Sequence, residues 1–566
     1  MKGFKLAENF LHFFEKRDHK ILPSFSLIPD DPTCLFTTAG MQPFKAYYLG
    51  KPCPWGKRVA TLQKCFRTSD IESVGDRTHL TFLLMLGNFS FGDYFKKEAI
   101  TWAKEFLFDK LKLSKKGVKV TVFGGEKEVP FDKESAEIWK SLGFENIEKK
   151  SREDNFWGPT GEEGPCGRTT EIIFGEVEVW NLVFNEYYQN KEKKLHLLSQ
   201  KGVDTGMGLE RLTMIVQKKP SIFETDLFEE IIKNLVRSSQ SSYKENPRVF
   251  RILADHLRAG VFLIADGIYP GNLEREYVLR RILRRCFRFE RIVGLSKKWY
   301  FGAIKEVIKI YSPFFPEIQS KSEEIFTVFE NEDEKFKKTL DKALKFLENL
   351  FLKKREKIIS GKEAFDLYQS YGFPLELTQE VALEKGFIVE KEKFFEELKK
   401  HQEISKRGQE KKFGGGGYLS PKHHTATHLL HSALREILGK DVRQMGSDIT
   451  EERLRFDFKF SGEIKKEEIL KIENLVNQKI KENLIVKKEE MPLKKAMESG
   501  ALAFFRERYP EVVSVYTIFN PKTGEVFSKE ICAGPHVQNT KELGTFKIEK
   551  FEKKGANIWR VRAKVI

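Results

Sequence analysis

The alternation of apolar and polar positions predicts an antiparallel hairpin over Arg58–Tyr94. Two apolar runs, Val59–Phe66 and Leu80–Leu86, flank a polar segment rich in Ser, Asp and Gly, which is the pattern of two strands joined by a loop. Arg67 stands where the first strand enters the loop, and His79 where the second strand leaves it. Such a hairpin can hold a triphosphate, or it can be a surface hairpin with solvated charges. The GNFSFGDYF segment that follows favours close packing around a site.

The same patterns predict helices and strands on both sides of this hairpin. We expect helices over residues 1–20, 96–111 and 134–142, and strands over Val118–Phe123 and Val177–Glu186. Asn181 lies inside the second of these strands, where a polar side chain needs a partner or a ligand. Asn155–Ile173 contains six Gly or Pro residues, so we expect a loop with tight turns there.

Residues 246–401 read as mostly helical. Arg275–Arg291 places one apolar stripe, including Val278, Ile282 and Cys286, among seven arginines. The guanidinium group of arginine can donate two parallel hydrogen bonds to a phosphate group, so this helix can bind a polyanion. The alternative is an arginine-rich helix paired with acidic neighbours of the same chain. Charged helices follow over 322–357 and 391–412, and FGGGGYL at 413–419 is the clearest linker of the chain.

The last part of the chain carries candidate metal ligands. His424 and His428 are four residues apart and share one face of a predicted helix. Cys532 and His536 lie far downstream in a turn after a strand-like run. Two histidines on a helix with a Cys and a His on a turn form a set that zinc accepts. The alternative is that these histidines cap or pack the helix.

Composition narrows the class of protein. The 566 residues are enough for three or four domains, and 40% of them are hydrophobic. The net charge of +16 fits a protein that meets a polyanion, although many lysines lie in runs typical of solvated helix faces. Six scattered cysteines indicate a reducing compartment. No apolar run is long enough to span a membrane, and the N-terminus does not read as a signal peptide, so we expect a cytoplasmic protein.

Together these segments resemble the alanyl-tRNA synthetases. The resemblance rests on nine stretches: TTAGMQPF (37–44), LQKCFR (62–67), HLTFLLMLGNFSFGDYF (79–95), GPCGRTTEI (164–172), VWNLVF (179–184), VDTGMGLER (203–211), YVLRRILRR (277–285), HTATHLLH (424–431) and CAGPH (532–536). GNFSFGDYF together with GMGLER is close to diagnostic. The resemblance implies an α+β fold with three parts: a class II catalytic domain built on an antiparallel sheet flanked by helices (1–240), a helical tRNA-recognition domain (241–412) and an α+β editing domain with zinc (413–566).

The resemblance also implies a reaction and its residues. Alanine would react with ATP, brought in with Mg²⁺, and the activated alanine would pass to alanine tRNA. The positions that match the family's alanine and ATP sites are Arg67, His79, Met85 and Arg211 for ATP, and Met41, Arg67, Trp157, Asn181, Val183, Asp204 and Gly206 for L-alanine. Arg67 and Arg211 would act catalytically. Asp204 would hold the ammonium group of alanine.

The positions for tRNA and for editing follow in the same way. Asn272 matches a residue that reads a G·U wobble pair in the acceptor stem, with Glu376 in place of its usual aspartate partner. Arg280, Arg281 and Arg284 would meet the tRNA backbone. His424, His428, Cys532 and His536 resemble ligands of one zinc ion in the editing domain, and Thr427 and Gln444 match residues that line the editing pocket.

The chain departs from the family in four places. Leu83 and Leu84 stand where the family usually has Phe and Glu, so Leu83 and Met85 would form the floor under adenine. Pro535 replaces a threonine of the CGGTH motif. A small β-barrel is expected to be missing before the editing domain. The chain ends at Ile566, from which we expect no C-terminal domain and a monomer.

A second function from another class stays open. The editing half is also typical of free-standing hydrolases that deacylate mischarged tRNA, and in that case the synthetase half would be degenerate. A non-catalytic RNA-binding protein is a further alternative. Arg67, Asp204 and Arg211 favour an active synthetase over both.

Overall fold

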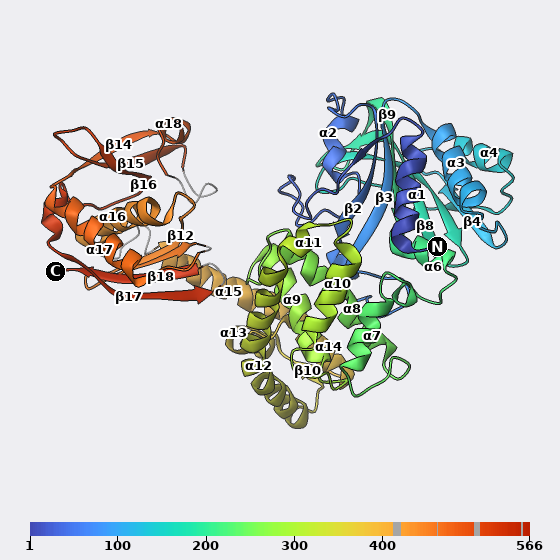
Figure 1. Cartoon of the computed structure of the whole chain (residues 1–566). Helices are drawn as coiled ribbons and strands as arrows, with labels where there is room; N and C mark the ends of the chain where they lie inside the picture. Colours follow the sequence, from blue (N-terminus) through green and yellow to red (C-terminus); the bar gives the residue numbers. More distant parts are fainter. Residues whose placement is uncertain (411–419, 461, 503–509, 556–557) are drawn as a thin grey trace. The chain divides into compact units, whose positions relative to one another are not determined.

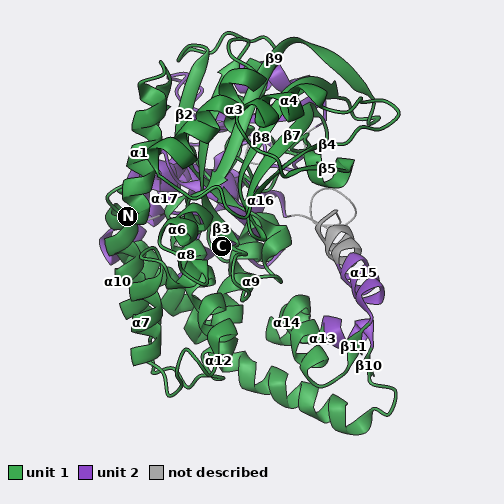
Figure 2. Cartoon of the chain, turned by 90° about the vertical axis from the view of Figure 1, so that its right-hand side faces the viewer, with its two compact units in different colours: residues 1–359, 366–389 green, residues 360–365, 390–566 purple. Residues whose placement is uncertain are grey.

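The computed structural model describes residues 1–410, 420–460, 462–502, 510–555 and 558–566. The chain forms two compact units (Figure 2). Unit 1 comprises 1–359 and 366–389, and unit 2 comprises 360–365 and 390–566. The linker predicted at 413–419 lies outside the described residues. The division into three domains stays a prediction.

Unit 1 is built on a nine-stranded sheet (Figure 1). Its order is β1-β2-β3-β9-β8-β7-β4-β5, with β6 on β7. The β1–β2 and β4–β5 pairs are parallel, and the other pairs are antiparallel. The strands are β1 Lys20–Leu22, β2 Arg58–Phe66, β3 Phe82–Phe91, β4 Val118–Phe123, β5 Ile147–Lys150, β6 Phe156–Trp157, β7 Gly164–Phe174, β8 Val177–Gln189 and β9 Leu195–Gly208. The predicted hairpin is the β2–β3 pair, which is confirmed as antiparallel.

Aromatic side chains from helices cover one face of this sheet. Phe10 and Phe14 of α1 and Phe106 after α3 contact Trp180 of β8, with ring centroids 5.6, 6.4 and 6.0 Å apart. Since successive side chains of a strand point to opposite faces, Asn181 and Val183 turn away from these helices. The helices of this part are α1 Gly3–Glu15, α2 Lys45–Tyr48, α3 Lys96–Lys104, α4 Lys133–Ser141, α5 Arg152–Asn155, α6 Leu209–Val216 and α7 Glu229–Arg237.

The loop predicted for Asn155–Ile173 is wrong in its second half, which is strand β7. Glycine is a common turn signal, but Gly167 allows two strands to pack closely. A Cβ atom at Gly167 would lie 1.8 Å from the backbone oxygen of Phe184 on β8. The glycine is therefore required inside the strand.

The remainder of unit 1 is helical, as the pattern predicted. Pro247 sits in the first turn of α8, where its fixed φ suits a helix start, and nearly all of that helix is buried. The elements are α8 Pro247–Ala265, α9 Glu274–Phe289, α10 Tyr300–Tyr311, α11 Glu317–Ser320, α12 Ser322–Lys353, α14 Leu375–Glu384 and the short pair β10 Ile358–Ile359 and β11 Ile388–Val389. Helix α13, Gly361–Tyr371, has residues in both units.

The arginine-rich helix α9 is paired with acidic neighbours on its buried side. Arg284 is 7% exposed, and its Nε donates to Glu332 at 2.6 Å. Arg285 and Arg288 are ion-paired with Glu380 at 3.0 and 3.2 Å. The acid-paired alternative therefore holds for these three arginines, and Arg284 has little surface left for RNA.

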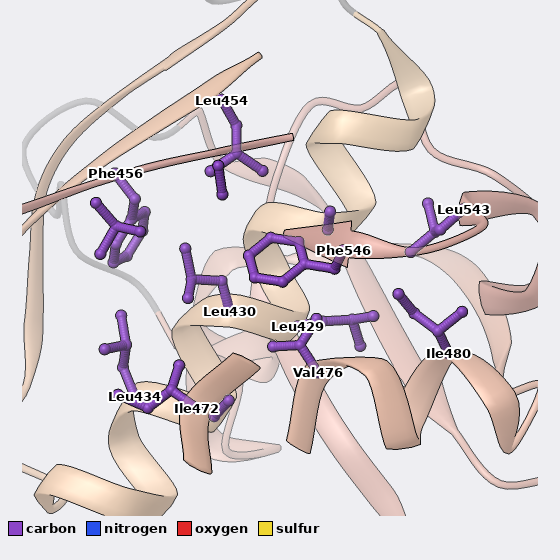
Figure 3. Close-up of a cluster of buried hydrophobic side chains, with 14 of the residues drawn as sticks. Leu429, Leu430, Leu434, Leu454, Phe456, Ile472, Val476, Ile480, Leu543 and Phe546 are labelled. Atoms are coloured by element: carbon purple, nitrogen blue, oxygen red, sulfur yellow. The ribbon is translucent and has the colours of Figure 1, made fainter. Parts of the chain in front are cut away.

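Unit 2 packs two helices against a four-stranded sheet. Leu429 and Leu434 of α16 and Val476 of α17 meet Phe456 and Val561 of the sheet in one apolar core (Figure 3). The sheet order is β12-β13-β18-β17, and a second sheet has the order β14-β15-β16. The elements are α15 Lys391–Glu410, α16 Pro421–Leu438, β12 Arg443–Ile449, β13 Leu454–Lys459, α17 Lys466–Lys481, β14 Ile485–Pro492, α18 Leu493–Glu498, β15 Val512–Phe519, β16 Val526–Ile531, β17 Phe546–Gly555 and β18 Ile558–Val565.

Candidate functional site

A buried carboxylate lies at the centre of the large sheet. Asp204 of β9 pairs with Val183 of β8, and two residues along Gly206 pairs with Asn181. These four residues, all predicted for the alanine site, thus share one face of two neighbouring strands. The face is the one that the α1 aromatics leave free.

Asp204 has the features of a group that awaits a cation. It is 4% exposed, and its carboxylate makes no hydrogen bond or ion pair with a described residue. Burial raises the pKa of Asp204 to about 8. A buried carboxylate without a partner is costly to ionise, so a cationic ligand at this position would bind strongly.

Small residues and sulfur make the walls around this carboxylate. A Cβ at Gly206 would lie 3.0 Å from Sδ of Met85, so any side chain there would press on Met85. The backbone N–H of Gly40 points to the same sulfur atom at 3.3 Å. Met41 is fully buried, and Trp157 packs against its cluster. The structure therefore places Met85 between Gly206 and Gly40, the residue that precedes Met41.

The two predicted catalytic arginines are held by oxygen atoms of neighbouring residues. Arg67 follows β2, and its Nε donates to the Thr38 carbonyl at 3.2 Å. Arg211 lies in α6, and its Nη1 donates to the carbonyl of Glu178 at 3.0 Å and to the Glu178 carboxylate at 3.3 Å. These bonds leave the remaining guanidinium donors free to meet phosphate oxygens. Nδ1 of His79 is 2.5 Å from the Asp76 carboxylate, which leaves Nε2 available to a ligand.

The loop between Arg67 and His79 is fastened to the helical layer. Arg285 of α9 donates to the carbonyl of Ile71 at 2.7 Å. Asp255 of α8 accepts from the backbone N–H and the hydroxyl of Thr81 at 3.0 and 2.5 Å. Both ends of the loop are thus fixed by buried side chains, which positions Arg67 and His79 before a ligand arrives.

Asn272 and Glu376 are also held by arginines of α9. The guanidinium of Arg280 donates to Oδ1 of Asn272. Arg281 lies 3.4 Å from the carboxylate of Glu376, which accepts from Tyr277 at 2.8 Å. The N-terminal half of α9 therefore positions both predicted readers of the acceptor stem.

The four predicted metal ligands meet in unit 2. The candidate ligand atoms of His424, His428, Cys532 and His536 all lie within 4.8 Å of one another. His424 Nε2 is 3.2 Å and His536 Nε2 3.5 Å from the Cys532 sulfur. The helix places the two histidines on one face, and the turn after β16 brings the cysteine to them, as the spacing predicted.

Neighbouring groups orient these ligands. Burial alone would raise the pKa of the Cys532 thiol, but hydrogen bonds with His424, His428 and His536 lower it to about 3, so the group is a thiolate. The Nδ1 of His424 donates to the carbonyl of Pro535 at 3.1 Å, leaving Nε2 for a metal. Three imidazoles and one thiolate with such outer partners fit a tetrahedral zinc ion.

Comparison with known proteins identifies the family. The family described as "tRNA synthetases class II (A)" matches residues 5–468, and "Threonyl and Alanyl tRNA synthetase second additional domain" matches 513–562. The chain is 43% identical to the alanine–tRNA ligase of Borreliella afzelii over 99% of both chains. The chain belongs to the alanyl-tRNA synthetase family. It is also 43% identical to the alanine–tRNA ligase of Treponema denticola, over 99% of this chain and 98% of that protein.

Solved structures add less to this assignment. A pyrrolysyl-tRNA synthetase from Desulfitobacterium hafniense matches 40% of this chain and 72% of that chain, with 11% identity and a TM-score of 0.25. That likeness is too low to support an argument. The alanyl-tRNA synthetase assignment rests on the family matches and on the curated relatives.

Thr427 and Gln444, the two residues predicted to line the editing pocket, have hydrogen-bond partners other than the metal ligands. Thr427 precedes His428 on α16, and its hydroxyl donates to the His423 carbonyl at 2.8 Å. Gln444 lies on β12 and donates to Ser447 at 3.2 Å. Their pocket role stays a prediction.

Two acidic residues of the sites escaped the sequence reasoning. Glu171 of β7 accepts from the Asn181 amide at 3.4 Å, and burial, with Glu178 nearby, raises its pKa to about 7. Glu530, two residues before Cys532, is 5% exposed and accepts from His431 at 2.8 Å. In the sequence, the only indication of a special role for these two residues is that each is an acidic residue within an apolar strand.

No helix among the described residues is long and apolar enough to cross a membrane.

Proposed function

We propose that this protein attaches alanine to alanine tRNA through alanyl-adenylate and hydrolyses tRNA that carries serine or glycine. The proposal rests on the agreement between the family assignment and the arrangement of residues around Asp204. Asp204 is a buried carboxylate without a partner, and it lies beside Val183, Asn181 and Gly206. The chain matches alanine–tRNA ligases over nearly their full length.

In the first step, the ammonium group of alanine pairs with Asp204. The alanine carboxylate oxygen attacks the α-phosphorus of ATP, the bond to the bridging oxygen breaks, and pyrophosphate leaves. Arg67 neutralises the charge that builds up between carboxylate and α-phosphate. Arg211 and His79 hold the far phosphates, and magnesium bound with ATP supplies further charge neutralisation there.

In the second step, a hydroxyl of the terminal ribose of tRNA attacks the alanyl carbonyl carbon. The bond to the phosphate oxygen breaks and AMP leaves. Asn272 and Glu376, held by Arg280 and Arg281, orient the acceptor stem by contact with its wobble pair.

The pocket accounts for the need of a second site. Gly206, Met85 and Met41 would leave space for one methyl group, which would reject larger side chains by overlap. Glycine lacks only that methyl, a difference worth about 1–3 kcal/mol. Serine adds only a hydroxyl, so it is also hard to exclude.

We assign this second, hydrolytic site to unit 2. His424, His428, Cys532 and His536 would hold one zinc ion. Bound zinc would polarise a water or anchor the substrate. Thr427 and Gln444 would line the pocket and orient the ester that is hydrolysed.

We further propose a cytoplasmic monomer with three functional parts, 1–240, 241–412 and 413–566. Sedimentation at micromolar concentration tests the monomer, and a stable dimer would contradict it.

Alanine-dependent pyrophosphate exchange tests the function. The wild type should exchange pyrophosphate with alanine, and Arg67→Ala should not. A folded wild type that deacylates seryl-tRNA but shows no exchange would instead be a free-standing hydrolase. Tight tRNA binding that survives Arg67→Ala, without any activity in the wild type, would indicate an RNA-binding protein.

A further inference from the structure

The sheet β12-β13-β18-β17 of unit 2 has one face turned to the protein core and one turned away from it. Leu454, Phe456 and Phe458 of β13 and Val561 and Ala563 of β18 are buried against α16 and α17. Figure 3 shows two of these side chains, Leu454 and Phe456, pointing from the sheet toward the helices. The residues between them in sequence therefore point to the opposite face, which we call the outer face.

The outer face is strongly basic. Strand register places eight cationic side chains on it against three carboxylates, Asp448, Asp457 and Glu552. A fourth carboxylate, Glu549, lies in a bulge of β17 and is ion-paired with Lys564 at 2.8 Å. The cations are Arg443, Arg455, Lys459, Lys547, Lys550, Arg560, Arg562 and Lys564. The side chains of Lys550 and Lys564 are 58% and 38% exposed, so solvent and ligands can reach this face.

One row across the sheet brings three cations side by side. Arg455 lies opposite Arg562, and Arg562 lies opposite Lys550. Like charges directly opposite each other on neighbouring strands destabilise a sheet. Arg560 in the adjacent row differs, because Asp457 holds it with two bonds of 2.7 and 2.8 Å.

Arg562 is the key residue of this row. It makes no hydrogen bond or ion pair with any described residue, and its Nε is buried without a partner. Its neighbours are partly compensated, since Arg455 is 3.6 Å from Asp457 and Lys550 is 2.9 Å from Glu552. A free guanidinium between two further cations is an arrangement that an anionic ligand would stabilise.

We propose that the outer face binds the phosphate backbone of double-stranded RNA, which under the proposed function is the tRNA whose ester unit 2 hydrolyses. Arginine forks match phosphate oxygens. The described outward positions of the four strands hold no aromatic residue, so this face offers bases nothing to stack on. It therefore fits a duplex backbone, contacted without regard to sequence.

The test removes the charged row in the full chain. A triple variant, Arg455→Gln with Lys550→Gln and Arg562→Gln, is compared with a control that loses the same charge from α17, Lys466→Gln with Lys471→Gln and Lys481→Gln. The probe is a labelled transcript of alanine tRNA, titrated at several KCl concentrations. Loss of three phosphate contacts, at about 0.9 per contact, should lower the slope of log Kd against log salt by about 2.7 in the row variant, and the slope should stay at the wild-type value in the control.

Three further readings make the outcome decisive. Zinc content should be the same in all three proteins, which shows that unit 2 is folded. Alanine-dependent pyrophosphate exchange uses no RNA. A wild type without this activity would refute the proposed function, and the RNA titration would still test whether the outer face binds RNA. Equal slopes in the row variant and the wild type would overturn the proposal. Competition by polyglutamate as effective as by RNA would assign the face to an acidic protein instead.

Discussion

The buried carboxylate of Asp204 predicts that affinity for alanine depends on pH. Burial raises the pKa of Asp204 to about 8, so the group is largely neutral at pH 6. The cationic ammonium of alanine binds the ionised carboxylate, whose fraction grows as pH rises toward 8. Alanine binding should therefore strengthen with pH over this range.

The size of the effect follows from the ionised fraction. Apparent affinity scales with the fraction of protein in the binding-competent form. With half of Asp204 ionised at pH 8, the KM for alanine should be about fivefold higher at pH 7 and about fiftyfold higher at pH 6. Asp204→Asn should bind alanine about 2–5 kcal/mol more weakly and lose the pH dependence.

The assay is pyrophosphate exchange at saturating ATP between pH 6 and pH 8. The KM for ATP over the same range is the internal control and should change little. A KM for alanine that stays flat from pH 6 to pH 8 would refute the role of Asp204. The same conclusion follows if the pH dependence persists in Asp204→Asn.

Three other predictions concern separate parts of the chain. Cys532→Ala should lose bound zinc and hydrolysis of seryl-tRNA while exchange continues, and an equal loss of both activities would argue against separate sites. Asn272→Ala should lower the preference for tRNA with the wobble pair over tRNA with a G·C pair, measured as the ratio of their kcat/KM values for charging, by about 1–3 kcal/mol. An unchanged ratio would show that Asn272 does not recognise the wobble pair. Arg258 is fully buried and 2.7 Å from Glu210, so Arg258→Leu should lower the free energy of unfolding by about 3–5 kcal/mol in urea. Replacing both partners with Leu should restore part of that loss, and a cost no smaller than in the single variant would contradict the pairing.

The sequence alone predicted the elements in which apolar residues recur with a clear strand or helix period. The hairpin of β2 and β3 follows from alternation, and α16 with His424 and His428 follows from helical spacing. The metal group needed only that spacing and a cysteine in a turn after a strand. The roles of Arg67, Asp204 and Arg211 came from family resemblance, because spacing alone does not give them chemistry.

Contacts between segments far apart in the chain could not be predicted from the sequence. Gly167 looked like a turn residue, and only the closeness of Phe184 on the next strand explains it. Arg284 looked free to bind RNA, and Glu332 on another helix neutralises it. Glu530 gave no sign of its bond to His431, since the two residues are 99 positions apart.

Aminoacylation of alanine tRNA, measured side by side with alanine, serine and glycine, tests the central claim most directly. The wild type should accumulate alanyl-tRNA only, and Cys532→Ala should accumulate seryl- and glycyl-tRNA as well. Failure of the folded wild type to charge alanine would contradict the synthetase function. Equal charging with all three amino acids by the wild type would contradict the editing function.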